Sequence, residues 1–70
     1  LRLFKQELGM TFGSYLRVAR IIRAIELLSD ANTAVTDVAY SVGYRSLSSF
    51  SQTFQQLTGI TPREYLKRFR

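Results

Sequence analysis

The sequence predicts an all-α fold, and three observations lead to this prediction. Apolar residues recur at intervals of three and four along most of the 70 residues, as they do on one face of an α-helix. No stretch alternates apolar and polar residues over a length that would indicate a β-strand. Residues that start and stop helices, such as Thr11, Ser46 and Gly59, separate the periodic segments. The sequence therefore predicts several short helices joined by tight turns.

The N-terminal part of the chain is expected to form two helices. The first ends near Leu8, where Gly9 can take the left-handed conformation that closes a helix. The second runs over about residues 12–29, with Thr11 as its N-cap. Its larger apolar face contains Val18, Ile21, Ile22, Ile25 and Leu28, and a second apolar strip contains Leu16, Ala24 and Leu27. A helix that is apolar on two sides is expected to pack against two partners.

Three more helices are expected after the turn at residues 30–33. The third runs over about residues 35–42, the fourth from its N-cap Ser46 to just before Gly59, and the fifth over about residues 62–69. Thr61 and Glu64 form a capping box around Pro62 in the first turn of the fifth helix. The apolar residues of the fourth helix are Leu47, Phe50, Phe54 and Leu57, and the aromatic residues expected in the core are Phe50, Phe54, Tyr65 and Phe69.

Residues 4–17 and 54–67 are related by a shift of fifty residues. The identical pairs are Phe4/Phe54, Gln6/Gln56, Gly9/Gly59, Thr11/Thr61, Tyr15/Tyr65 and Leu16/Leu66. In both copies a Gly ends one helix and a Thr caps the next, so the repeated feature is a helix junction. A long helical stretch precedes the second copy, whereas little precedes the first copy, and the chain begins with Leu1. We therefore expect a fragment that starts within the first of two similar units.

The composition excludes several classes of function. The chain has no Cys and no His, so it lacks the ligands of common zinc sites and an imidazole base, and we expect no metal or other cofactor. No nucleophile stands beside a base and no carboxylates form an acid/base pair, so we expect no enzyme. No apolar run approaches the roughly 20 residues of a membrane span, so we expect no membrane partner. The formal net charge of +5 indicates an anionic partner, most often nucleic acid.

The third and fourth expected helices meet at residues 42–46 in a pattern typical of a helix-turn-helix motif. Ala39 is small enough for close helix approach, and Gly43 suits the sharp turn. In such a motif the second helix enters the DNA major groove. Its solvent face would present Ser48, Ser49, Gln52, Gln55 and Gln56, of which Gln can read adenine and Ser can bind bases or phosphates. A plain helical hairpin with a polar surface is the alternative that this pattern leaves open.

Several spaced motifs occur along the chain in one order: the run from Ala34 to Phe54, followed by Gly59-Ile60-Thr61-Pro62 and Tyr65. Together they resemble the signature of the AraC/XylS family of bacterial transcription regulators. The segments that resemble the linker helix of that family are Tyr15-Leu16, Arg20, Ala24 and Leu27-Leu28, and those that resemble the end of its first recognition helix are Arg2-Leu3-Phe4-Lys5 and Glu7-Leu8-Gly9. The resemblance covers nearly the whole chain.

The resemblance implies sequence-specific binding of double-stranded promoter or operator DNA, by a regulator of the bacterial cytoplasm that associates with the nucleoid. It implies homeodomain-like three-helix units with a helix-turn-helix motif: residues 1–10 as the remnant of the first unit, residues 11–32 as a linker helix and residues 33–70 as the second unit. The recognition helix, residues 46–57, would lie in the major groove. The expected DNA contacts are Arg2 in the first unit and, in the second, Arg45, Ser46, Leu47, Ser48, Ser49, Ser51 and Gln52.

The expected recognition helix departs from the family pattern in its charge. The family usually has a basic residue at the position of Gln52, whereas residues 46–58 here carry no charge. This predicts base reading by neutral side chains and backbone binding by arginines elsewhere. Arg20 is expected to have a structural role beside an acid or a helix end. The basic C-terminal residues Arg63, Lys67, Arg68 and Arg70 are expected to form a solvated face, with supplementary phosphate contact as the other interpretation.

A protein-interaction module is the alternative from a different functional class. In that interpretation the apolar residues Leu1, Leu3 and Leu8 form a surface for self-association or for another regulator or an RNA polymerase subunit, and DNA binding is weak or absent. A salt titration of duplex DNA binding separates the two hypotheses, because phosphate contacts make binding steeply dependent on salt.

Overall fold

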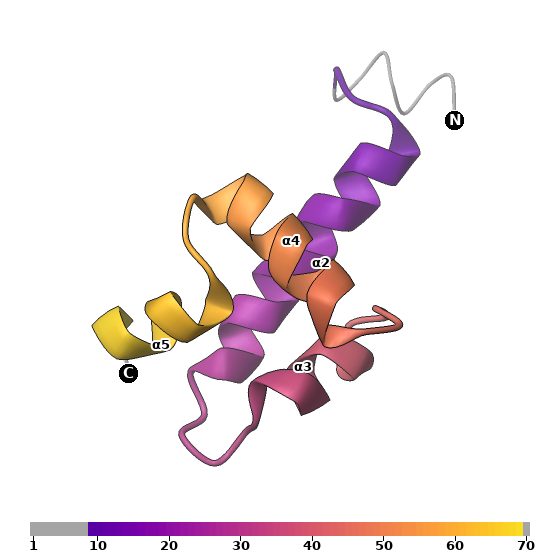
Figure 1. The fold of residues 1–70 in the computed structure, drawn as a ribbon. Helices are drawn as coiled ribbons and strands as arrows, with labels where there is room; N and C mark the ends of the chain where they lie inside the picture. The colour runs from indigo at the N-terminus through magenta and orange to yellow at the C-terminus, as the bar shows by residue number, and fades with distance from the viewer. Residues whose placement is uncertain (1–8, 70) are drawn as a thin grey trace.

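The computed structural model describes residues 9–69, and these residues form four helices without a strand (Figure 1). Helix α2 spans Phe12–Leu28, α3 spans Val35–Ser41, α4 spans Leu47–Thr58 and α5 spans Pro62–Phe69. The all-α prediction is confirmed, and each of these helices begins and ends within about one residue of its expected bounds. The helix expected before Leu8 lies outside the described residues.

The fold is a small cluster of α3, α4 and α5 around the C-terminal half of α2. Helices α3 and α4 both pack against α2 and against each other, and α5 packs against α4. Figure 1 shows that the N-terminal half of α2 projects beyond this cluster. The buried core comes from three helices and the turn after α3, and it consists of Ile21, Ala24, Leu28, Val38, Ala39, Val42, Phe50 and Phe54. Within residues 9–69, no helix combines the length and the apolar character that crossing a membrane requires.

The predicted N-caps are confirmed by hydrogen bonds of one geometry. The backbone N–H of Ser14 donates to Thr11 Oγ1, that of Ser49 to Ser46 Oγ and that of Glu64 to Thr61 Oγ1, each at 3.1 Å. Each bond satisfies a donor that the first turn of a helix leaves unpaired. Helices α2, α4 and α5 therefore begin where the sequence places a hydroxyl side chain.

The C-terminal end of α4 is set by Gly59. This residue has a φ of 88°, in the left-handed region that glycine adopts without strain, and its N–H donates to the Gln55 carbonyl oxygen at 2.8 Å. The chain then turns so that Pro62 begins α5, where a missing N–H is harmless.

Only part of the expected apolar surface of α2 is covered by the described residues. Ile21, Ala24 and Leu28 are buried against α3 and α4, whereas the side chain of Ile22 is 56% exposed. Ile22 borders an open pocket together with Leu57 and Thr58 at the end of α4, and this pocket leaves its side chain in contact with solvent. Both expected apolar sides contribute to the packing, the larger face through Ile21, Ile25 and Leu28 and the second strip through Ala24 and Leu27.

Aromatic rings connect the turn before α4 to the end of α5. Successive ring centroids are 5.6 Å apart for Tyr44 and Phe50, 5.7 Å for Phe50 and Phe54, 5.9 Å for Phe54 and Tyr65, and 4.9 Å for Tyr65 and Phe69. Phe50 and Phe54 are buried, and Tyr44 and Tyr65 are half-buried, but Phe69 is 67% exposed. The core assignment of Phe69 is wrong because the last turn of α5 extends past the core, so that its ring packs on Tyr65 with its other side in solvent. Leu57, in the last turn of α4, is also exposed, by 43%.

Candidate nucleic-acid interface

The turn between α3 and α4 is closed by two backbone hydrogen bonds. The N–H of Gly43 donates to the carbonyl oxygen of Tyr40 at 3.1 Å, and the N–H of Tyr44 donates to that of Ala39 at 3.0 Å. This pair of bonds is a Schellman motif, which requires a left-handed residue after the helix. Gly43 supplies it with a φ of 100°. The sharp turn predicted at Gly43 is therefore confirmed.

Close packing of the two helices joined by this turn depends on small and apolar side chains of α3. Val38 and Ala39 are fully buried, and Phe50 of α4 is buried with them. Because Ala39 carries only a methyl group, α3 can lie near α4 without displacing that ring. The structure therefore contains the helix-turn-helix arrangement that the sequence predicts.

Helix α4 has an apolar side in the core and a polar side in solvent. Phe50 and Phe54 occupy the buried side. The exposed side carries hydroxyl and amide groups, from Ser48, Ser49, Gln52, Gln55 and Gln56. The predicted solvent face is thus confirmed. Since residues 46–58 contain no charged side chain, this face offers hydrogen-bond donors and acceptors but no side-chain charge.

The structure brings the predicted contact residues together at the start of α4, except Arg2, which lies outside the described residues. Ser48, Ser49 and Gln52 are exposed on one side of the helix, and Arg45 is exposed just before it. Ser46 acts as the N-cap, and its hydroxyl also donates to Ser49 Oγ at 3.2 Å. The half-buried members of the set are Ser46, Leu47, which packs against the core, and Ser51.

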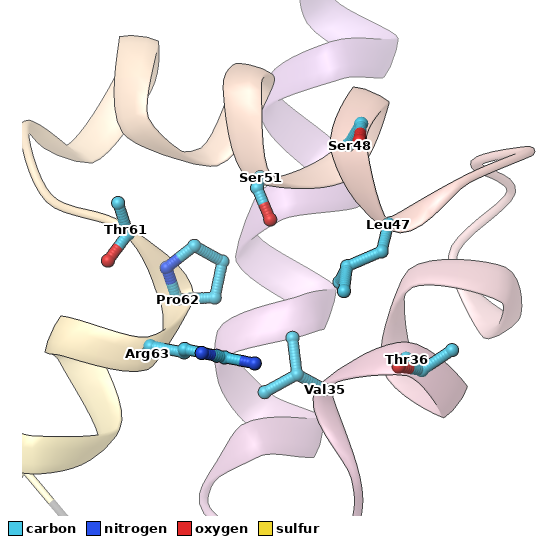
Figure 2. A pocket seen from close by; sticks show the side chains of 8 residues that line it. All are labelled: Val35, Thr36, Leu47, Ser48, Ser51, Thr61, Pro62 and Arg63. Carbon is cyan, nitrogen blue, oxygen red and sulfur yellow. The ribbon is translucent and has the colours of Figure 1, made fainter.

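An open cleft of about 570 Å³ borders this part of α4 and is formed by the starts of three helices (Figure 2). Its lining residues are Val35 and Thr36 of α3, Leu47, Ser48 and Ser51 of α4, and Thr61, Pro62 and Arg63 around the start of α5. Figure 2 shows the Arg63 side chain reaching toward Val35 and the Ser51 hydroxyl pointing into the cleft. We call this feature the α3–α4–α5 cleft. It places one cation and several hydroxyl groups beside the uncharged face of α4.

Sequence reasoning about the contact set did not find the contributions of α3 and α5 to this cleft. Val35 and Thr36 precede α4 by more than ten residues, and Thr61 and Pro62 follow its start by a similar distance. Their assembly depends on how the helices pack, which periodicity along one helix does not report. The sequence shows only that each of these four residues lies at or next to the first turn of an expected helix.

Arg20 of α2 lies at the C-terminal end of α3. Its Cζ and Nε atoms are 3.3 Å from the position that a Cβ atom on Gly43 would occupy, and its Cζ atom is 5.8 Å from the centroid of the Tyr44 ring. This location agrees with the expected structural role beside a helix end. The neighbouring Arg23, by contrast, is exposed and lies 4.0 Å from Glu26 on the same helix.

The chain is similar to known proteins over nearly its whole length. A family profile described as "Helix-turn-helix domain" matches residues 1–68. The chain belongs to the AraC-type helix-turn-helix family. The HTH-type transcriptional activator RhaR of Mannheimia succiniciproducens is 38% identical over 68 residues, which cover 97% of this chain and 25% of that protein. RhaR of Yersinia pestis bv. Antiqua (strain Angola) is 37% identical over 97% of this chain and 23% of its own length.

A solved structure agrees with the fold. The crystal structure of the transcriptional regulator CdpR from Pseudomonas aeruginosa superposes with a TM-score of 0.81 and 30% sequence identity, over 90% of this chain and 20% of that chain. The chain thus spans about a quarter of the length of the curated relatives it matches. Among residues 9–69, no group of three or more His, Cys, Asp or Glu residues gathers where it could hold a metal ion.

Proposed function

We propose that this chain is a DNA-binding part of a transcription regulator and that it recognises double-stranded DNA by placing the start of α4 in the major groove. The observation that carries the proposal is the exposed, uncharged polar face of a capped helix that directly follows a helix-turn-helix turn. Membership of the AraC-type family and similarity to proteins named as transcription regulators support the same ligand class.

Base reading is assigned to the exposed residues of the first two turns of α4. Gln52 can form a bidentate pair with adenine, and Ser48 and Ser49 can donate or accept a hydrogen bond at a base edge. These three side chains share one side of the helix, so one docking pose presents all of them. A good bidentate pair discriminates by about 1–3 kcal/mol against the wrong base.

Backbone binding is assigned to the margins of α4. Arg45 is exposed before the N-cap, and Arg63 extends across the α3–α4–α5 cleft. A guanidinium group binds phosphate oxygens well, and hydroxyl groups of Thr36 and Ser51 can add neutral contacts. Ser46 and Leu47 contribute to DNA binding indirectly, because the N-cap and the core contact fix the position of the start of α4. The cleft is therefore proposed to take a stretch of the sugar–phosphate strand.

The proposed organisation of the chain has three segments: residues 1–10 as the end of a first helix-turn-helix unit, residues 11–32 as a linker helix and residues 33–70 as the second unit. The fifty-residue repeat supports it, together with the matching caps at Thr11 and Thr61. Arg2 would contribute a contact from the first unit. We place such a regulator on the nucleoid in the bacterial cytoplasm.

The experiment uses the purified protein, a duplex selected from a random pool and a scrambled duplex of equal length. We expect the selected duplex to bind at least about 10³-fold more tightly, and log Kobs to fall linearly and steeply with log salt concentration. Gln52→Ala should change the preferred base pair at one position, while the control Gln56→Ala, further along the same helix, should not. Salt-independent binding, or equal binding of both duplexes, would instead favour the protein-interaction module.

A further inference from the structure

We propose that Arg20 is a positioning residue for base reading: it holds the turn at Gly43 and Tyr44 in the geometry that aims the exposed face of α4. This inference rests on the proposed function. Arg20 belongs to α2, a helix that carries none of the proposed base contacts, yet its guanidinium lies against the turn that sets where α4 begins. Its effect on DNA recognition would pass through the turn and not through contact with DNA.

The turn leaves room for the Arg20 side chain because residue 43 has no Cβ atom. A Cβ there would lie 3.3 Å from both Cζ and Nε of Arg20, and 3.5 Å from its Nη2. The φ of 100° also disfavours any other residue. The conformational requirement for glycine at position 43 is therefore the stronger one, and the contact with Arg20 adds a smaller steric one, since a Cβ would displace the guanidinium by a few tenths of an ångström.

The contact continues from the turn into α4. The Tyr44 ring has the Arg20 guanidinium 5.8 Å from its centroid and the Phe50 ring in an edge-to-face contact at 5.6 Å. Phe50 is fully buried in the first turn of α4. Among the described residues the buried Tyr44 hydroxyl has no hydrogen-bond partner, so the ring and not the hydroxyl makes the connection. Packed groups thus run from α2 through Tyr44 to the reading helix.

The planar shape of the guanidinium matters for this role. Arg20 is half-buried, whereas Arg17 and Arg23 on the same helix are exposed. A planar, weakly hydrated group can stack on a ring and on glycine backbone, but the ammonium of Lys is a compact, strongly hydrated charge. A Lys at position 20 would keep the charge and lose the packing. Base contacts need a helix placed to within a fraction of an ångström, whereas phosphate contacts from long side chains tolerate small shifts.

The test compares Arg20→Lys and Arg20→Gln with the control Arg23→Lys on the same helix. We expect both Arg20 variants to lower the ratio of specific to non-specific affinity by roughly tenfold and to leave the salt slope unchanged, and the control to alter neither. If Arg20 instead bound phosphate, Arg20→Lys would keep the affinity and Arg20→Gln would lower the slope by about 0.9. That result would overturn the inference.

A second measurement needs no variant and applies even if the Arg20 variants fail to fold. The NMR signal of the Arg20 Nε–H should carry a ring-current shift from Tyr44 in the free protein and keep it when the selected duplex is added. Loss of that shift on DNA binding would contradict a positioning role.

If the wild-type protein prefers its selected duplex but Arg20→Lys retains the full preference, the inference fails and the proposed function stands. If the wild-type protein shows no preference, both fail.

Discussion

Helices α2 and α4 are the two longest described elements, and they distribute charge in opposite ways. Arg17, Arg20 and Arg23 lie along α2, whereas α4 presents serines and glutamines and no charge. Of these arginines only Arg20 faces the turn before α4. The basic residues of the chain therefore lie outside its proposed reading surface. Non-specific attraction to DNA and recognition of bases should therefore respond to different substitutions.

The largest expected effect comes from the buried side of α4. Phe50→Ala removes a fully buried ring that contacts Tyr44 and Phe54, and we expect it to lower the free energy of unfolding by about 3–5 kcal/mol. In a domain of this size such a loss is enough to prevent folding. The matched control is Gln52→Ala on the exposed side, which should change stability by less than about 0.5 kcal/mol. Urea denaturation followed by circular dichroism measures both, and equal losses would contradict the assigned faces of α4.

A smaller loss of stability is expected from a substitution at Gly43, in the turn between α3 and α4. Gly43→Ala places a Cβ on a residue with a φ of 100° and beside Arg20, so we expect a loss of about 1–2 kcal/mol or more. Gly13→Ala is a useful control, because Gly13 lies within α2 with nothing near its added methyl group, and there we expect a gain of about 0.5–1 kcal/mol. Thermal unfolding checks the opposite signs. A neutral Gly43→Ala would show that the turn is not constrained as described.

The start of α4 offers a still smaller and more local effect. Ser46→Ala removes the hydroxyl that accepts the Ser49 N–H at 3.1 Å, and we expect a loss of about 1 kcal/mol. Ser48→Ala, two residues later on the exposed side, should leave stability unchanged within about 0.5 kcal/mol. Chemical denaturation of the two variants separates the cap from the proposed reading face. Equal stability of both variants would remove Ser46 as the determinant of where α4 begins.

The parts of the fold that could be predicted are those determined by local chemistry. Thr11, Ser46 and Thr61 cap helices where expected, and Gly43 and Gly59 take left-handed conformations, because these effects act within one turn of the residue. The parts that could not be predicted depend on which surfaces meet. Phe69 has the spacing of a core residue, yet its ring is exposed because α5 runs past the core.

The candidate site divides in the same way. The exposed face of α4 follows from helical periodicity and the buried positions of Phe50 and Phe54. The α3–α4–α5 cleft does not, because Val35 and Arg63 are 28 positions apart in the sequence and are brought to one cleft by helix packing. The contact of Arg20 with Gly43 has the same origin. A structural role for Arg20 was predictable, but its partner was not.

The most direct measurement of the division between base reading and backbone binding is the salt dependence of DNA affinity for three variants. Arg45→Gln and Arg63→Gln should each lower the slope of log Kobs against log salt by about 0.9 and weaken all duplexes alike. Gln52→Ala should leave the slope unchanged and reduce discrimination at one base pair by about 1–3 kcal/mol. Unchanged slopes in both arginine variants, together with unchanged base preference in Gln52→Ala, would contradict the proposed docking of α4 in the major groove.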